Sequence, residues 1–432
     1  MRINMKINAI SKKIISYLPE LFLVFLGMFF FSPTSKICNS FYYAIIIPAT
    51  IFALLNIDFQ PLKKQPIIYI TLLYFLYAIC SVLWSENLTA HSMIKIIKHS
   101  FYVITFGLFI YATLQKHGWK FKKILYYATI LASFSAFVSI CYWYGYKGNS
   151  FHERLVGCFR NYNTAASNLA YGSCFLFVLY NIIYTRRNLL INVLISLPLF
   201  AFIVLTQSRS TAGIMFFFAI IFVMYYYRKN IKLFIVSTSI VCFVALLYYH
   251  TILNWRYESI NQEMMTIEQT NSELKQNELS RYCPFRPYIW KFFFQKVLER
   301  PIFGHGFSAK NKFIIQEDNL QRPFEHPHSL YLSQLYYGGI VAFCIFVIMI
   351  CMFFYIVMQH HCRPMVPILT IFILFTLLIY ILDGDSLIKQ PREFWFSFWM
   401  PYFSILSIVF LDIKYPEEQK LVEHSDEQKL IV

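Results

Sequence analysis

Long apolar runs separated by short polar links recur along almost the whole chain. Runs of about 18 or more apolar residues can cross the roughly 30 Å hydrocarbon core of a membrane as helices. Twelve such runs are found, at about residues 14–32, 38–56, 66–84, 96–114, 123–145, 164–184, 189–206 and 211–227, then one ending near Trp255, then 329–357, 365–383 and 393–413. The pattern predicts an all-α integral membrane protein with about 12 transmembrane helices.

One large polar segment interrupts this pattern between the ninth and tenth predicted helices. It divides the chain into four regions. These are residues 1–254 with helices 1–9 and short loops, 255–328 as a large loop with short amphipathic helices, 329–413 with helices 10–12, and 414–432 as a tail.

The composition supports a membrane protein, because 58% of the residues are hydrophobic, 20% are aromatic and only 14% are charged. A soluble domain carries far more charge. The first apolar run is too long for a cleavable signal peptide and lacks a small-residue cleavage site, so we expect a retained helix.

The formal net charge of +16 is spread along the chain rather than gathered in one patch, which argues against nucleic-acid binding. Lys and Arg concentrate in every second short connection, and basic connections face the cytoplasm. Both termini are therefore expected inside and the large segment outside. The basic positions are Arg2, Lys6, Lys12, Lys13, Lys63, Lys64, Lys116, Lys120, Lys122, Lys123, Arg186, Arg187, Arg228, Lys229 and Lys232.

The ten cysteines show no C-x-x-C spacing, and most fall inside predicted helices, so we predict no structural metal. Only Cys158 and Cys283 lie in predicted outer loops, and whether they form a bridge stays open. No internal repeat is visible, which leaves a repeat-built transporter without support.

The first candidate for chemistry on the outer side is Arg209, in "LTQSRSTAG" between the seventh and eighth predicted helices. An arginine at this boundary runs against the positive-inside bias and generally needs a partner or a task. A side chain that snorkels to lipid headgroups is the alternative. The flanking Ser208, Ser210 and Thr211 favour a polar pocket.

A second arginine, Arg286, stands in the large outer segment, with Trp290 four residues later on the same helical face. A solvated loop charge is the simplest interpretation of Arg286, and Arg281 is a competing candidate. A short amphipathic helix follows until "RPIFGHG", where Gly304 and Gly306 mark a tight turn that lets backbone approach a ligand or another helix.

Two histidines, His326 and His328, precede the tenth predicted helix, with Ser329 as its expected cap. A neutral imidazole can take a proton from a hydroxyl group, whereas guanidinium groups bind phosphate oxygens through a planar fork of donors. Arginines and a histidine together suit transfer from a lipid diphosphate to an alcohol. Interfacial histidines without a catalytic role are the alternative, and Glu325 is a candidate to orient one of them.

Four motifs in order resemble those of bacterial O-antigen ligases, a family shared with O-antigen polymerases. "RLVGCFRNYNTAASNLA" at 154–170 is similar to the pattern R-x-x-G-x-F-x-N-x-N, and "SRSTAG" at 208–213 to the S-R-S/T element. "RPYIW" with "RPIFGHG" resembles R-x-x-x-W … P-x-x-G-x-G. "HSLYLSQLYYGG" at 328–339 resembles H-N-x-Y-L … G.

The resemblance implies that Arg209 and Arg286 bind a diphosphate and that His328, rather than His326, is the catalytic histidine, since only His328 has the family spacing to Gly339. Two positions depart from the family pattern. Ser329 replaces the usual asparagine, although its hydroxyl can still cap a helix, and Tyr162 replaces a common proline.

The resemblance also implies a glycosyltransferase of the GT-C type in the bacterial inner membrane, with its active site in the periplasm. The donor would be O-antigen on undecaprenyl diphosphate, and the acceptor a hydroxyl of lipid A-core. Transfer would proceed with inversion, without a metal, a cofactor or a nucleotide sugar.

Further residues are candidates for substrate contact. Trp290 and Tyr331 suit packing or sugar stacking. The remaining candidates, for which contact with lipid headgroups is an equal explanation, are Arg154, Arg160, Lys389 and Arg392.

An O-antigen polymerase is the alternative function. Polymerases of this kind tend to have two sizeable outer loops, each with an arginine followed eleven positions later by a glycine. Here one loop is long, and none of the fourteen arginines has a glycine at that offset. These features favour the ligase.

Overall fold

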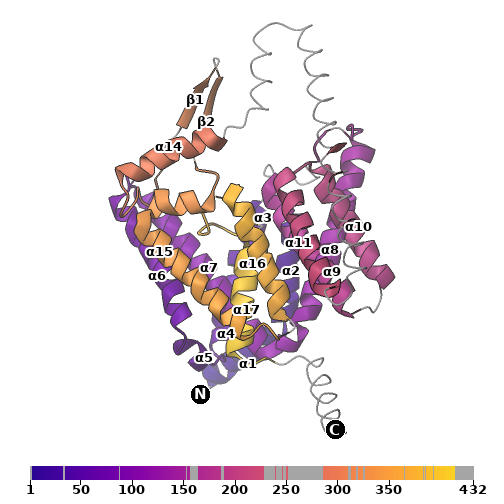
Figure 1. Cartoon of the computed structure of the whole chain (residues 1–432). Helices are drawn as coiled ribbons and strands as arrows, with labels where there is room; N and C mark the ends of the chain where they lie inside the picture. The colour runs from indigo at the N-terminus through magenta and orange to yellow at the C-terminus, as the bar shows by residue number, and fades with distance from the viewer. Residues whose placement is uncertain are drawn as a thin grey trace, which may run out of the picture.

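The computed structural model is a bundle of apolar helices with a smaller cap at one end (Figure 1). The described residues are 2–155, 164–227 and 286–413, apart from 33–34, 87, 152, 186–188, 310–312, 318–319, 325, 364, 383, 385 and 393, together with 239, 246, 250 and 251. Within them, helices occupy eleven of the twelve predicted spans. Apart from residues 239, 246, 250 and 251, the ninth span lies outside the described residues, as do the first part of the large segment and the tail.

The first half of the bundle contains α1 (Arg2–Ser16), α2 (Leu18–Phe31), α3 (Ser35–Phe41), η1 (Tyr42–Ile46), α4 (Ile47–Leu54), α5 (Gln60–Lys63), α6 (Pro66–Cys80), η2 (Ser81–Trp84), α7 (Ala90–His117), η3 (Gly118–Lys120), α8 (Phe121–Ile140) and η4 (Cys141–Tyr146). The rest consists of α9 (Thr164–Thr185), α10 (Leu189–Leu205), α11 (Arg209–Tyr227), α14 (Arg286–Glu299), β1 (Phe313–Glu317), β2 (Leu320–Phe324), α15 (Leu330–Gln359), α16 (Met365–Leu382), η5 (Trp395–Trp399) and α17 (Met400–Phe410).

Several of these helices are long and apolar enough to cross a membrane, which makes the chain a multi-pass membrane protein. Among the described residues five helices meet this condition, or six if the bent pair α1 and α2 counts as one span. Shorter apolar helices at Ala170–Ile182, Leu189–Leu205 and Trp395–Phe410 stand beside them.

The helical run Ala90–Tyr146 contains two antiparallel helices rather than one. Lys120, at the end of η3, lies 3.9 Å from Glu20, and the hydroxyl of Ser135 in α8 donates to the carbonyl of Phe30, so α8 runs parallel to α2. Aromatic pairs between α2 and α7 follow the opposite order: Phe22 with Phe109 and Phe25 with Phe106. The chain therefore reverses at η3, as the two separate predicted spans require.

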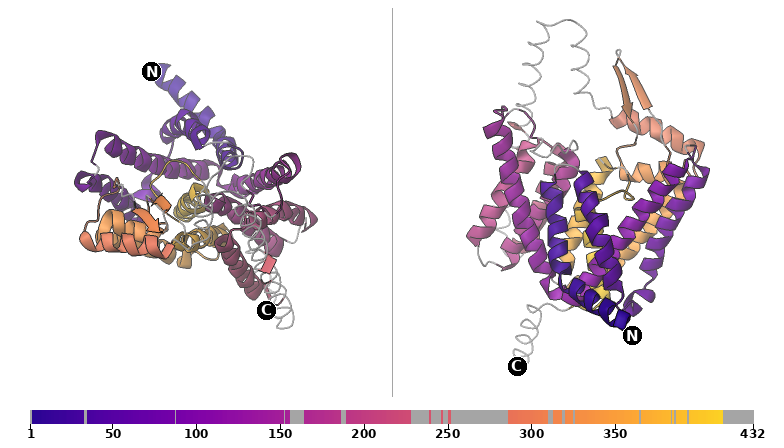
Figure 2. Two further views of the ribbon diagram at one scale, coloured as in Figure 1. Left: turned by 90° about the horizontal axis from the view of Figure 1, so that it is seen from above. Right: turned by 180° about the vertical axis from the view of Figure 1, so that it is seen from behind.

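The bundle has two chemically different ends. One end, hereafter the basic end, gathers α1, α5, η3 and the α15–α16 link, and with them many of the lysines predicted to face the cytoplasm (Figure 2). There His117 contacts the carbonyl of Ile15 at 2.9 Å, and Arg363 donates to the carboxylate of Asp412 at 2.6 Å. The opposite end carries α14 and the hairpin.

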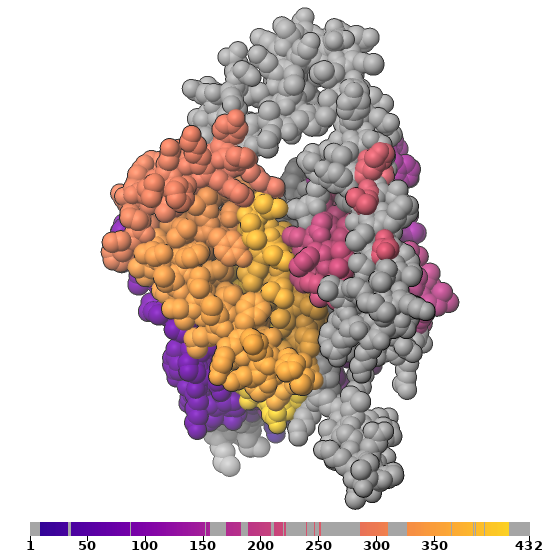
Figure 3. Space-filling model, in the orientation of Figure 1, coloured from indigo at the N-terminus to yellow at the C-terminus, as the bar shows by residue number. Residues whose placement is uncertain are grey.

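The cap consists of α14, the turn that follows it, and the antiparallel hairpin β1–β2, in which Phe313 pairs with Phe324 and Glu317 with Leu320. Helix α14 was predicted, whereas the hairpin was not, so the prediction of an all-α chain with only helices in this segment was incomplete. Figure 3 shows α14 and the turn after it lying over the outer end of α15.

Aromatic side chains fill the centre of the bundle. Trp395 packs against Phe106 with ring centroids 4.9 Å apart and meets Tyr42 edge-on at 5.2 Å. The hydroxyl of Tyr42 donates to the carbonyl of Tyr102, and that bond satisfies a polar group that would otherwise be costly to bury. This rigid interior supports the outer end of α16 and the loop after it.

Candidate functional site

The tenth predicted span is not one straight helix, because α15 breaks at Gly339, whose φ of 64° and ψ of −166° are not helical. Its first turns, residues 330–338, lie across the top of the bundle beneath α14, and the remainder descends through the bundle (Figure 1). His328 therefore precedes the short helical segment 330–338 beneath the cap, rather than standing at the mouth of the span itself.

The turn after α14 supplies hydrogen-bond partners for the backbone groups at the break in α15. Amides of the turn donate to carbonyls at the end of the first helical segment, from His305 to Tyr336 at 2.9 Å and from Gly306 to Tyr337 at 2.7 Å. On the far side of the break, the amide of Ile340 donates to a carbonyl of the turn at 2.9 Å. Backbone groups freed by the break are thus satisfied within the protein, as the apolar surroundings require.

Glycines permit this close approach. A Cβ on Gly304 would lie 2.5 Å from the amide nitrogen of Gly339, and one on Gly306 would lie 2.6 Å from the carbonyl oxygen of Ser81. All three glycines have positive φ, a region that glycine enters without steric cost. The predicted tight turn is confirmed, and its backbone approaches α15 at Gly304 and η2 at Gly306.

Helix α14 runs parallel to the first segment of α15 and brings Arg286 to the level of the histidines. Phe293 packs edge-on against Tyr336 with ring centroids 4.9 Å apart, and the end of α14 leads to the break in α15. Arg286 lies seven residues before Phe293, and Ser329 lies seven residues before Tyr336. Because both segments rise equally per residue, exposed Arg286 stands level with Ser329 and hence with His328.

The two histidines lie together just before α15. The ring centroids of His326 and His328 are 4.1 Å apart, and both side chains are half-buried. His328 has a φ of 51°, a left-handed conformation that is uncommon for residues other than glycine. Ser329 occupies the predicted N-cap position, but its side chain makes no capping hydrogen bond.

Arg154 bonds to the turn between α10 and α11. The guanidinium of Arg154 donates to the carbonyl of Thr206 at 3.2 Å, and Arg209 is the first residue of α11 rather than the last of the helix before it. The hydroxyls of Ser208 and Thr211 are buried and 2.9 Å apart. The turn is therefore polar and enclosed.

Helical geometry brings this turn level with the start of α15. Phe218 of α11 and Phe375 of α16 are in contact with ring centroids 6.2 Å apart, and the two helices run in opposite directions. Arg209 lies nine residues before Phe218, and Gly384 lies nine residues after Phe375. Each is therefore about 13 Å along the helix from its contact residue, in the direction of the cap. A Cβ on Gly384 would lie 3.2 Å from the amide nitrogen of Leu330.

Arg392 ends the loop that begins at Gly384. Its carbonyl accepts from the amide of Trp395 at 2.9 Å, and its side chain is half-buried. The loop is held in place at Leu387, whose carbonyl accepts from the indole of Trp399 at 2.9 Å. Arg392 thus belongs to the same outer end as the histidines.

The two aromatic candidates point into packed surroundings. The hydroxyl of Tyr331 donates to the carbonyl of Leu377 at 3.1 Å, which ties α15 to α16. Trp290 is partly buried against the core, and its indole nitrogen has no hydrogen-bond partner among the described residues. The buried hydroxyl of Ser333, which lies at the same level on α15, likewise has no hydrogen-bond partner among the described residues.

His305 joins α14, α15 and the segment after η2, a role that was not predicted from the sequence. Its buried ring stacks on Tyr336 at 4.9 Å, its Nε2 lies 2.7 Å from the carbonyl of Lys296, and its Nδ1 lies 3.5 Å from Glu86. The signal that the sequence offers for His305 is its position between two glycines of a tight turn. Its partners come from distant parts of the chain and leave no local pattern.

Charges on α14 are unequally distributed. Lys296 bonds to exposed Glu299 at 2.8 Å and thereby holds the pKa of that carboxyl group below its usual range. Arg300 pairs with Glu86 at 3.2 Å. These carboxylates lie near the end of α14 that is remote from Arg286. The end of the helix that carries Arg286 is therefore the more positive one.

Some predicted positions lie outside the described residues: Arg160, Arg281, Glu325, Cys158 and Cys283. Within the part of the chain that the structure describes, no group of three His, Cys, Asp or Glu side chains is close enough to hold a metal ion.

The fold and the outer end define a multi-pass membrane protein that presents arginines and histidines beyond one end of its helices. Residues 194–347 match the family model described as O-antigen ligase. The chain is also 24% identical over 384 residues to the O-antigen ligase of Pseudomonas aeruginosa, a match that covers 87% of this chain and 86% of that protein. These matches confirm the resemblance to the O-antigen ligase family of lipopolysaccharide biosynthesis.

The match to the family model covers α11, α14, the hairpin and the break in α15. It includes Arg209, Arg286 and His328, and it excludes Arg154 and Arg392. The match to the family model therefore includes the cap and the turn before α11.

Proposed function

We propose that the protein is an O-antigen ligase. It transfers O-antigen polysaccharide from undecaprenyl diphosphate to a hydroxyl group of lipid A-core, with inversion and without a metal ion. Support comes from the family match over the cap and from the relative in Pseudomonas aeruginosa, which is named an O-antigen ligase.

In the proposed reaction, the imidazole of His328 takes the proton from the acceptor hydroxyl. The acceptor oxygen attacks the anomeric carbon of the O-antigen, and the bond from that carbon to the diphosphate breaks. The electron pair leaves with undecaprenyl diphosphate. Arg209 and Arg286 stabilise the charge that develops on the leaving group, as fixed cations do most effectively where charge appears in the transition state.

The observation that supports this proposal is the packing of α14 on the first segment of α15, from which we infer that Arg286 stands level with His328. A base and an anion-binding group must both reach one anomeric centre, and that arrangement supplies both from rigid elements. We further propose that substrate is contacted by Arg154, Arg160, Trp290, His326, Tyr331 and Arg392.

The distribution of charge supports a definite orientation in the inner membrane. Basic connections remain on the cytoplasmic side, so the basic end of the bundle faces the cytoplasm with both termini. The cap and the histidines then face the periplasm, where lipid-linked O-antigen and lipid A-core meet. We propose twelve transmembrane helices, of which the ninth ends near Trp255.

Deletion of the gene tests ligase against polymerase. Cells without the protein should accumulate long O-antigen on undecaprenyl diphosphate while lipid A-core remains bare. Lipid-linked glycan can be separated by length after mild acid release, and lipopolysaccharide can be separated by electrophoresis. Accumulation of single repeat units would instead identify a polymerase, and unchanged lipopolysaccharide would reject both functions.

Arg286→Lys should lower the rate of transfer by about 10- to 100-fold, because an ammonium group keeps the charge but cannot bind a diphosphate through two parallel hydrogen bonds. The rate would be measured with purified protein, lipid-linked donor and lipid A-core. Lys291→Gln, which removes an exposed charge from the same helix, is the matched control and should stay within about twofold of wild type. Equal rates for both variants would remove Arg286 from the donor site.

A further inference from the structure

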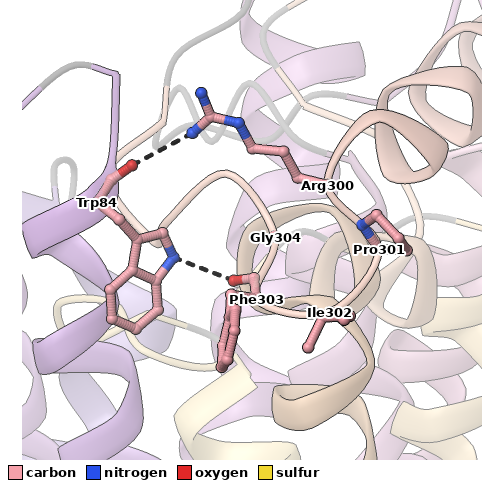
Figure 4. A pocket seen from close by; sticks show the side chains of 6 residues that line it. All are labelled: Trp84, Arg300, Pro301, Ile302, Phe303 and Gly304. Carbon is pink, nitrogen blue, oxygen red and sulfur yellow. Dashed lines mark hydrogen bonds between the residues drawn. The ribbon is translucent and has the colours of Figure 1, made fainter.

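An apolar notch lies at the end of α14 remote from Arg286. It encloses about 530 Å³ and is lined by Trp84, Arg300, Pro301, Ile302, Phe303 and Gly304. Figure 4 shows the indole of Trp84 and the ring of Phe303 below the turn, with the side chain of Arg300 passing above them. No step of the proposed transfer uses this notch.

Hydrogen bonds from side chains to backbone carbonyls join the two sides of the notch. The indole of Trp84 donates to the carbonyl of Phe303 at 3.1 Å, and Arg300 donates to the carbonyl of Trp84 at 3.3 Å. Because the turn is fixed through its backbone, its apolar side chains point outwards: Ile302 is 55% exposed and Phe303 is 57% exposed. Side chains of this size are seldom left together at a surface unless something covers them.

The notch continues the lipid-facing side of the bundle. Helix α6 leads up to it with an exposed apolar stripe, and α15, which packs beside α6, exposes Ile340 just below the break. The stripe ends at Trp84, an aromatic residue of the kind that marks the membrane–water boundary. Its exposed members are Leu72, Leu73, Leu76 and Leu83.

A cation stands above this apolar surface. The side chain of Arg300 is about half exposed and pairs with Glu86 at 3.2 Å, while Lys296 on the preceding turn is engaged by Glu299. Guanidinium above an apolar wall at a membrane boundary matches an amphiphile with a phosphate head and acyl chains.

The distance from His328 decides which lipid fits. Arg286 stands level with His328, and Arg300 lies fourteen residues further along α14 and its turn, which is about 21 Å for a helix. The diphosphate of the donor is bonded directly to the sugar that is transferred, so it must lie at His328. The phosphates of lipid A are separated from the acceptor hydroxyl by several core sugars, so they must lie some distance away.

We propose that the notch binds the lipid A portion of the acceptor, with acyl chains against Trp84, Ile302 and Phe303 and a phosphate near Arg300. This inference rests on the proposed ligase function. It assigns donor and acceptor lipids to opposite ends of α14, so the core oligosaccharide spans the helix and brings its outer sugar to His328.

Binding of lipid A that lacks core sugars tests the site without requiring transfer. The full-length protein in detergent would be titrated with this lipid and examined by native mass spectrometry, with phosphatidylglycerol and undecaprenyl phosphate as competitors. Phe303→Asp and Ile302→Asp each place a carboxylate in the notch on an exposed side chain, so the fold is kept. Leu88→Asp alters an exposed apolar residue of the same rim outside the notch and is the matched control.

We expect lipid A retention to fall at least tenfold in both notch variants and to be unchanged in Leu88→Asp. In transfer assays, the notch variants should raise the KM for lipid A-core while leaving kcat and the KM for the donor unaltered. Equal displacement by phosphatidylglycerol, preferred binding of undecaprenyl phosphate, or unchanged retention in the notch variants would overturn the assignment. If the wild-type protein binds lipid A in the notch but transfers no glycan, the proposed function is rejected while the assignment of the notch to lipid A is kept.

Discussion

His328→Asn is expected to lower the rate of O-antigen transfer by about 10²- to 10⁴-fold, the usual contribution of a general base. Asparagine is the informative replacement because His328 has a φ of 51°, and asparagine adopts this left-handed conformation more readily than alanine does. The variant therefore keeps the backbone before α15 and removes only the basic imidazole. A loss of activity can then be assigned to chemistry rather than to a displaced helix.

His326→Asn is the matched control, since the two rings lie only 4.1 Å apart and share the same surroundings. We expect this variant to retain at least roughly a fifth of the wild-type activity, because His326 takes no proton in the proposed reaction. Initial rates with saturating donor and acceptor would be compared after both variants are shown to reach wild-type levels in the membrane. If His326→Asn were the inactive variant, the assignment of the base from the spacing to Gly339 would be wrong.

Membrane helices could be predicted from the sequence because hydropathy is a local property of each run. The reversal between α7 and α8 was also predictable, since the polar residues around Lys120 separate two apolar runs. The break in α15 was not. Hydropathy continues through Gly339 without change, and the groups that stabilise the break come from a turn some forty residues earlier.

The candidate site shows the same division. Arg209, Arg286 and His328 could be selected from motif order, but nothing in their spacing shows that α14 runs parallel to the first segment of α15. His305 escaped notice because its contacts with Glu86 and Tyr336 are all non-local. The hairpin was missed because its strands are five residues long and are joined without the Asn-Gly or Asp-Gly pair that signals a tight turn.

Gly339→Ala is expected to have the second large effect, by destabilising the cap. With φ near +64° and ψ near −166°, Gly339 occupies a region open essentially only to glycine, at a cost of about 3 kcal/mol for another residue. The added methyl group would also collide with the carbonyl of Ile302 and lie 2.7 Å from the amide nitrogen of Gly304. Relief of that collision requires the turn after α14 to move away from α15.

Such a movement separates the two helices whose packing sets Arg286 level with His328, so activity should fall further than the amount of folded protein. A change of this free energy lowers the abundance of a membrane protein severalfold, which immunoblotting of membranes measures, while transfer per molecule should fall by at least tenfold. Gly145→Ala is the matched control, because a Cβ there meets nothing within 4 Å. Wild-type transfer per molecule in Gly339→Ala would show that the turn and α15 need not be in contact, and the alignment of arginine and histidine would then have to arise from another part of the chain.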